Sequence, residues 1–329
     1  MSAANLLAQS CNNPKETFMR FRDFMCKRNG TYDYSTTGIG WTLHDSSYAV
    51  NEDTISVNDY FVMYSAGEDG LRNMYFKIQY VSGYINILGF LYWNAGTHAG
   101  VHQFGAANSW TNPLDTNNIL WVYGDLDAFC GIAKYSASYN AGQGGWCPDS
   151  PTSQEITTSA GAITAGSSVI VSFTAVPAEW AVGTKLFVRD TANIERVNIS
   201  AISGTDVTFT TFVASYSAGC TFCLEENTFV STQNANSSHY VLIDHSGAKN
   251  GSVSPDNPGI AGLASGSGLT GKYPAKKVHL SSATTLIGPL KNQLAAISTF
   301  TSETTHTLGA DGYRFFNLYS ARYALIKEV

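Results

Sequence analysis

The stretch GAITAGSSVIVSFTAVPAEWAVGTKLFVRDTANIERVNISAISGTDVTFTTFVASYSAGCTF, residues 161–222, decides the fold class of this chain. It contains four short runs rich in β-branched and aromatic residues: AGSSVIVSFT (165–174), GTKLFVRD (183–190), ERVNIS (195–200) and DVTFTTF (206–212). Turn residues separate these runs at nearly regular spacing, which is typical of a compact all-β unit. The sequence therefore predicts a small β-barrel or β-sandwich module over 156–228, inserted into a larger β-rich body made of 1–155 and 229–329.

The composition indicates a globular protein with an uncharged surface. The 329 residues are 44% hydrophobic, enough for a buried core and for two or three domains. Charged residues are only 13%, about half the usual share. A surface poor in charge and rich in small polar and aromatic groups is often covered by a partner, which favours assembly. An ordinary all-β protein with a polar, uncharged surface is the alternative.

Charge and hydropathy argue against two kinds of partner. A net charge of −6 does not favour a broad phosphate-binding face, so we expect no direct nucleic-acid partner. The first residues, MSAANLLAQS, lack a basic segment followed by an apolar core, and no uncharged apolar run reaches membrane-spanning length. We therefore expect a chain synthesised in the cytoplasm and not held in a membrane.

The cysteines do not form a disulfide framework. Six of them are scattered along the chain: Cys11, Cys26, Cys130, Cys147, Cys220 and Cys223. Cys220 and Cys223 form a CxxC, but no second pair completes four zinc ligands, and positions i and i+3 of a strand point to opposite faces. We expect buried reduced thiols, with no metal and no other cofactor.

One helix is well signalled, in CNNPKETFMRFRDFMCKRNG (11–30). Asn13 can cap it, Pro14 suits its first position and Glu16 stands where a capping-box carboxylate would be. Lys27, Arg28 and Gly30 form the expected charge and stop pattern. Phe18, Phe21 and Phe24 give the helix one apolar face. This face either backs a sheet of the same chain or docks onto a partner, and these three residues are interface candidates.

The body reads as antiparallel β structure. Four aromatic and β-branched runs follow the helix: GIGWTLHD (38–45), DYFVMYS (59–65), LRNMYFKIQY (71–80) and YINILGFLYW (84–93). In the third, alternation puts Met74, Phe76 and Ile78 on a buried face and Lys77 on a wet one. The segment AGEDG (66–70) predicts a hairpin connection, and Gly124-Asp125 predicts a second hairpin. The fold class is mainly β, a helix-backed antiparallel β-sandwich body.

Two segments rich in glycine and asparagine look irregular. Residues 94–118 read as a loop between the hairpins, and NAGQGGWCPDSPTSQE (140–155) reads as a domain boundary. A third segment, about 247–277, is a long Gly/Ser/Pro-rich arm that we expect to become ordered against a neighbour. Its interface candidates are Gly247, Pro258, Lys272 and Tyr273. The terminal DGYRFFNLYSARYALIKEV (311–329) reads as a strand pair that closes the sheet of the body.

No set of residues with catalytic spacing emerges. Asp125 and Asp127 lie at a hairpin tip, where carboxylates commonly make Asx turns. Asp244 and His245 are strand neighbours that point to opposite faces. His98 and His102 are four apart, but their glycine-rich surroundings argue against a helix that would bring them together. GSGLTGK (266–272) lacks the spacing of a phosphate-binding loop, and no hydrolase, metalloprotease or dinucleotide motif occurs. We therefore expect no enzyme activity.

Tryptophans offer an alternative kind of site. Trp110 and Trp146 lie near Tyr and Asn residues and could stack against sugar rings, which makes them glycan-binding candidates. Packing in a core or an interface is the competing explanation.

Several segments resemble virion structural proteins of tailed bacteriophages. They are GWTLHD (40–45), DYFVMYSAGEDGLRNMYFKIQY (59–80), FLYWNAGTHAG (90–100) and WVYGDLDAFCGIAKYSASY (121–139), and the opening stretch looks like the small β units of phage tail and neck proteins.

The resemblance implies a virion location and a structural role in a neck, collar, tail or baseplate. Such subunits assemble as rings or sleeves with copies of themselves and with other virion proteins, through β-sheet surfaces and extended arms. The resemblance implies no active-site residues. The alternative within the same particle is a baseplate or tail-surface module that binds host surface glycans.

Overall fold

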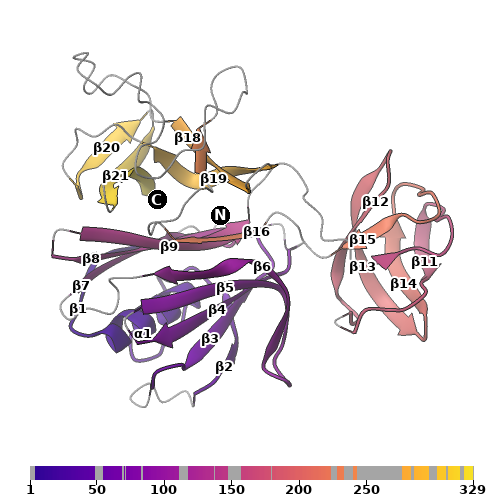
Figure 1. The fold of residues 1–329 in the computed structure, drawn as a ribbon, viewed down its shortest axis with the longest axis horizontal. Coiled ribbons are helices and arrows are strands. Elements are labelled where there is room, and N and C mark those ends of the chain that lie inside the picture. Colours follow the sequence, from indigo (N-terminus) through magenta and orange to yellow (C-terminus); the bar gives the residue numbers. More distant parts are fainter. Residues whose placement is uncertain are drawn as a thin grey trace.

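The computed structural model describes residues 4–48, 55–68, 70, 72–82, 84–110, 118–136, 138–146, 157–178, 180–223, 228–232, 240–242, 276–282, 285–295, 302–308, 310–318 and 322–328. The predicted fold class is confirmed, because the chain is mainly β and its sheets are antiparallel with one short parallel bridge. Figure 1 shows a layered body and a separate smaller β unit. No helix among the described residues is long and apolar enough to cross a membrane.

The first layer of the body is a five-stranded meander with the order β2-β3-β4-β5-β6. Its strands are β2 (Thr42–Ser46), β3 (Tyr60–Ser65), β4 (Met74–Val81), β5 (Tyr84–Asn94) and β6 (Ala99–Trp110). The alternation predicted for β4 is confirmed, because Met74, Phe76 and Ile78 are fully buried while Lys77 is half-buried. The hairpin predicted between β3 and β4 is also present, with Ser65 paired to Met74.

The second and third layers belong to one long sheet that folds over. Its path is β1-β7-β8-β9-β21-β22-β19-β18-β17, with β16 paired to β9 and β20 to β21. The middle-layer strands are β1 (Ala4–Cys11), β7 (Asn118–Gly124), β8 (Ala128–Tyr135), β9 (Ser138–Trp146) and β16 (Thr228–Thr232). The outer-layer strands are β17 (Tyr240–Leu242), β18 (Lys276–Ser282), β19 (Thr285–Ala295), β20 (Thr305–Leu308), β21 (Asp311–Leu318) and β22 (Arg322–Glu328). In Figure 1 these outer strands lie across β7–β9 on the side away from the five-stranded sheet.

The central strands of the middle layer, β7, β8 and β9, are largely buried on both faces. Leu120 and Val122 of β7 point into the core shared with the five-stranded sheet. Trp121 alternates with them and packs on Phe316 of β21, with ring centroids 5.3 Å apart. The predicted terminal strand pair is therefore present, as β21 and β22, but it forms an additional layer instead of extending a two-layer sandwich. It meets β9 through one parallel bridge between Leu318 and Tyr139.

Helix α1 (Pro14–Met25) begins as the sequence predicts. Asn13 has an extended backbone and its Oδ1 accepts the Glu16 amide at 3.0 Å, while the Glu16 carboxylate accepts the amide of Asn12 at 2.8 Å. The end differs from the prediction, because Lys27, not Gly30, takes the left-handed conformation with φ 50°. Gly30 has another role: a Cβ there would lie 2.6 Å from the buried carboxylate of Asp23.

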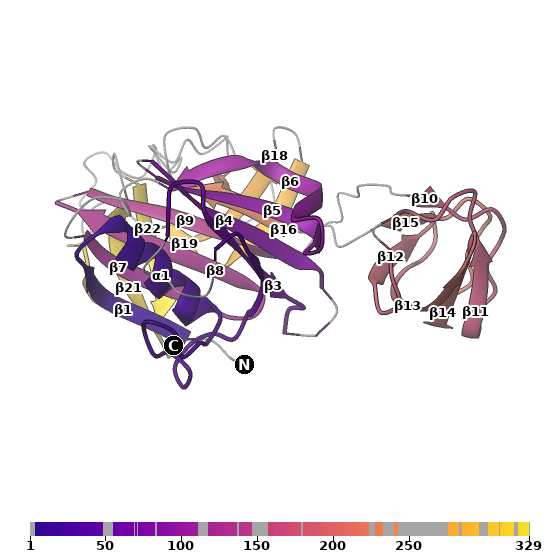
Figure 2. The same ribbon diagram turned by 90° about the horizontal axis from the view of Figure 1, so that it is seen from below.

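The apolar face of α1 reaches both sheets of the body. Figures 1 and 2 show the helix against β1 and β7, beside the concave side of the five-stranded sheet. Phe18 packs edge-on against Phe61 of β3, with ring centroids 5.0 Å apart. Phe21 meets Phe129 of β8 at 5.6 Å and also touches the five-stranded sheet. The helix therefore closes the space between two layers.

Two segments that the sequence analysis expected to be irregular contain strand residues. The first contains all of β6, which pairs with β5, and the start of the second lies in β9, which pairs with β8. The prediction was wrong because glycine, alanine and asparagine normally mark connections. In this protein, glycines lie within strands because they leave room for large side chains of the facing sheet.

Glycines on β8 and β9 admit large rings from the facing sheet. A Cβ on Gly131 would lie 2.5 Å from the ring of Trp110, and a Cβ on Gly142 would lie 2.8 Å from the same ring. A Cβ on Gly144 would lie 2.5 Å from the ring of Phe76. Real Cβ atoms do not approach that closely, so only glycine lets these aromatic side chains lie against the backbone of the middle layer.

Residues between 157 and 223 form a six-stranded sheet that pairs with no other described strand, in the order β10-β15-β12-β13-β14-β11. Its strands are β10 (Thr157–Thr158), β11 (Gly166–Ser172), β12 (Lys185–Arg189), β13 (Ile194–Ser203), β14 (Asp206–Phe212) and β15 (Thr221–Cys223). A bridge from Ser159 to Phe173 links its two ends, so the sheet curls towards a barrel. Its core is aromatic, with Phe222 between Phe173 and Phe209 at 5.0 and 5.3 Å.

This unit, the module, leaves and re-enters the body at nearby points. Thr157 pairs with Phe222, so its first and last strands are adjacent. The chain then returns as β16, which pairs with β9, the last strand before the module. Figures 1 and 2 both show the module standing beside the body. A hydrogen bond from Asn73 Nδ2 to the carbonyl of Lys185, at 2.8 Å, joins the body and the module.

We predict that Gly142→Ala destabilises the protein by about 1–3 kcal/mol, because the added methyl group meets Trp110 and Ile87 in a packed interior. Gly161→Ala is the matched control, since a Cβ there has no heavy atom within 4 Å, and its effect should stay within roughly 0.5 kcal/mol. Denaturant unfolding of the two variants measures the difference. Equal effects would contradict the packing role given to Gly142.

Candidate functional site

The structure buries the candidates on the helix and leaves those on the arm outside the residues that it describes. Phe18, Phe21 and Phe24 are fully buried in the chain's own core, so they are not available as interface residues. The candidates Gly247, Pro258, Lys272 and Tyr273 lie outside the described residues, as do Asp244, His245 and the segment 266–272.

The two tryptophans proposed for glycan stacking differ in their exposure. Trp110 is fully buried between the sheets, and its Nε1 donates to the carbonyl of Asn140 at 3.1 Å. Trp146 is half-buried, and the guanidinium carbon of Arg72 lies 3.2 Å from the centroid of its ring. One ring face is therefore already occupied by a cation–π contact. The stacking hypothesis is therefore wrong for Trp110, which is fully buried, and stays a prediction for Trp146, which keeps part of its side chain exposed.

The two aspartates at the hairpin tip have structural roles. Asp125 Oδ1 accepts the amides of Asp127 and Ala128 at 2.8 and 3.0 Å, which is the expected Asx turn. Asp127 Oδ1 accepts the amide of Glu68 at 2.9 Å and lies 3.6 Å from Arg72 Nε. Asp125 thus stabilises the β7–β8 turn, and the contacts of Asp127 tie this turn to the β3–β4 turn. Both carboxylates therefore have structural roles.

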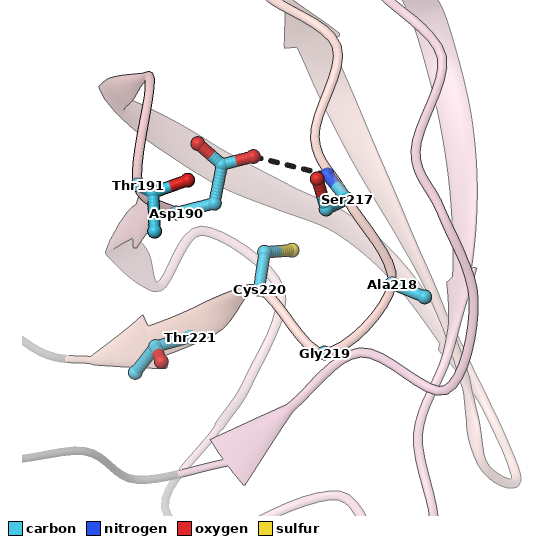
Figure 3. A pocket seen from close by; sticks show the side chains of 7 residues that line it. All are labelled: Asp190, Thr191, Ser217, Ala218, Gly219, Cys220 and Thr221. Atoms are coloured by element: carbon cyan, nitrogen blue, oxygen red, sulfur yellow. Dashed lines mark hydrogen bonds between the residues drawn. The ribbon is translucent and has the colours of Figure 1, made fainter.

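The module contains an open depression with a volume of about 340 Å³. Its lining comes from two turns: Asp190, Thr191, Ser217, Ala218, Gly219, Cys220 and Thr221. Figure 3 shows the Asp190 carboxylate pointing at the backbone nitrogen of Ser217, with the sulfur of Cys220 on the same side. An acid beside a thiol and a hydroxyl invites a catalytic interpretation.

The hydrogen bonds of the Asp190 carboxylate indicate a structural role. Asp190 Oδ2 accepts the Ser217 amide at 3.0 Å, and Oδ1 accepts the amides of Ala192 and Asn193 at 2.8 and 2.9 Å. These backbone bonds hold the pKa of Asp190 below its usual range. A carboxylate with so low a pKa is a poor general base near neutral pH. It clamps the β12–β13 turn to the turn that precedes β15.

Cys220 is not an activated thiol. Burial raises its pKa, against the hydrogen bond with Ser159, whose Oγ lies 3.2 Å from the sulfur. The thiolate is the nucleophile and metal ligand, so a raised pKa makes the group inert. The other described cysteines, Cys11, Cys26, Cys130 and Cys223, are also buried, as predicted. Within the described residues no three His, Cys, Asp or Glu side chains gather as metal ligands.

The outer face of the five-stranded sheet carries a row of rings, one from each of four neighbouring strands. His44 of β2 lies 5.0 Å from Tyr75 of β4, and Tyr64 of β3 lies 4.6 Å from the same ring. Tyr92 of β5 continues the row at 6.2 Å from Tyr75. All four side chains are half-buried, so the row, which we call the aromatic row, is part of the protein surface.

A polar corner adjoins the aromatic row. The Asp45 carboxylate accepts Trp93 Nε1 at 2.7 Å and lies 2.9 Å from His98 Nδ1. Burial would raise the pKa of Asp45, but the bonds from His98 and Trp93 outweigh it and the pKa is lowered. Lys77 Nζ lies 4.2 Å from the centroid of Tyr60, and burial lowers its pKa, with Asp45 acting in the opposite direction.

Sequence reasoning missed the aromatic row. Each ring was visible in a predicted strand, but no residue spacing within one strand brings the four together. They meet because Thr42 pairs with Tyr64 and Tyr64 pairs with Tyr75, and because a bulge at His44 turns its side chain onto the same face. The usable signal would have been the tyrosines at the polar positions of the alternating pattern.

No protein-family model matches the sequence, and no curated protein is significantly similar to it.

We predict that Asp190→Asn lowers the unfolding temperature at neutral pH, because the amide group puts a donor where the carboxylate accepts. The pKa of Asp190 is lower in the folded protein, so its contribution is complete above the unfolded pKa of about 3.9 and is lost as the pH falls through the folded value. The gap between wild type and variant should therefore narrow in acid. Calorimetry across pH measures it.

Asp206→Asn is the control for this substitution. Its carboxylate accepts the Ser172 hydroxyl at 2.6 Å at an exposed site, and the atoms of the clamp are untouched. Identical pH profiles for the two variants would show that the Asp190 clamp does not stabilise the module.

Proposed function

We propose that this chain is a structural subunit of a tailed-bacteriophage virion, which acts by contact with copies of itself and with other virion proteins. The observation that carries the proposal is the use made of the acidic and thiol groups. Asp125, Asp127 and Asp190 all accept hydrogen bonds from backbone amides and so hold turns together. Burial raises the pKa of the Cys220 thiol, so this group is not activated as a nucleophile.

The architecture supports the same role. Aromatic side chains fill the spaces between the layers of the body, and the module adds a second surface at its side. Sheet edges and faces are surfaces through which such subunits assemble. A ring or sleeve in the neck, collar or tail fits these surfaces and the resemblance of 59–80 and 121–139 to virion proteins.

Proteomics of gradient-purified particles of the phage that encodes the chain tests this proposal. We predict that the chain co-purifies with the capsid and tail proteins in a fixed stoichiometry of several copies, because a ring or sleeve needs repeated subunits. Absence from purified particles, although the chain is made during infection, would contradict a structural role.

The arm at 247–277 supplies a second test. Its composition favours ordering against a neighbour, so a deletion of residues 247–275, which ends before β18, should leave the subunit folded and prevent its assembly. Sedimentation and negative-stain imaging of the purified full chain and the deletion compare the two. Normal rings from the deletion variant would remove the arm from the proposed assembly.

A further inference from the structure

We propose that the outer face of the five-stranded sheet binds a neutral oligosaccharide, with the aromatic row as its platform. The inference concerns the isolated chain and does not rest on the proposed virion role. It starts from the four half-buried rings of His44, Tyr64, Tyr75 and Tyr92, which form one continuous strip across four strands.

The length and chemistry of the strip suit a short sugar chain. The ring centroids of His44 and Tyr92 lie 5.0 and 6.2 Å from that of Tyr75, so the strip is longer than a single sugar ring. A sugar offers apolar C–H faces and a rim of hydroxyl groups, and tyrosine and histidine offer a ring with a polar tip. Tyr64 Oη lies 3.4 Å from the carbonyl of Arg72, so its hydroxyl is held at the rim of the strip.

The charges beside the strip are already matched. Asp45 is bound by Trp93 Nε1 and by His98, and its side chain is only 7% exposed. The Lys77 ammonium lies over the ring of Tyr60, 4.2 Å from its centroid. An acidic ligand would bring a second negative charge beside the Asp45 carboxylate, whereas a neutral ligand leaves both contacts intact. This selects an uncharged sugar chain over an acidic polysaccharide or a nucleic acid.

The platform is rigid before any ligand binds. Beside the strip, on the same face of the sheet, Val62 is fully buried, and Phe90 and Trp93 are almost fully buried. Phe90 and Trp93 pack edge-on at 5.3 Å, and Gly100 lies directly against the Phe90 ring. Side chains fixed in this way lose little conformational freedom when a ligand binds.

Binding of the full chain to an array of neutral and acidic oligosaccharides tests the proposal. We expect signals confined to neutral glycans, and calorimetric titration with the strongest of them should show about a tenfold loss of affinity in Tyr64→Ala and in Tyr92→Ala. Tyr64→Phe keeps the ring and should retain most of the affinity. Tyr135→Ala, which removes a 43% exposed tyrosine on β8, is the matched control and should bind as wild type.

Three results would overturn the proposal. One is an array with no neutral glycan bound by the wild-type chain. Another is wild-type affinity in both Tyr64→Ala and Tyr92→Ala when circular dichroism shows them folded. The third is a change in oligomeric state in these variants with no change in sugar binding, which would make the strip a contact between protein chains.

Discussion

The close approach of the β8 and β9 backbones to the rings of the facing sheet sets the geometry of the body. Trp110 lies where Cβ atoms of Gly131 and Gly142 would be, and Phe76 lies against Gly144. The distance between the five-stranded sheet and the middle layer is therefore set by the contact of these aromatic rings with the glycine backbone. Helix α1 depends on the same contact, because Phe21 touches both Trp110 and Phe129 and fills the remaining space. The face opposite this contact supports the third layer through Trp121.

Local sequence signals were sufficient for part of this fold. Period-two alternation located β4, and the Asn13 cap located the start of α1, because both signals act within a few residues. They failed for β6 and for the start of β9. A glycine that makes room for a ring across the interface cannot be told from a glycine in a linker when the ring lies more than twenty residues away. The third layer was missed for a related reason, since β21 joins β9 through a single bridge.

The prediction of surface binding residues was limited in the same way, because it used local sequence signals. Tryptophans were chosen as binding candidates for their size, but large rings have the most to gain from burial, and Trp110 is fully buried. The half-exposed rings are tyrosines at the wet positions of the sheet, and cross-strand register brings them into one strip. The hydrogen bonds likewise changed the interpretation of Asp190 from a reactive group to a structural one. Asp190 looks reactive beside Cys220, yet three backbone amides fix its carboxylate.

Native-state hydrogen exchange tests the central claim that the middle layer, packed on both faces, holds the body together. The account predicts that amides of β8 and β9 exchange only through global unfolding of the body and are its slowest, while those of the edge strand β2 exchange through local opening. Exchange in β8 and β9 as fast as in β2 would contradict it, because glycine-rich strands that open locally could not be the fixed support of three layers.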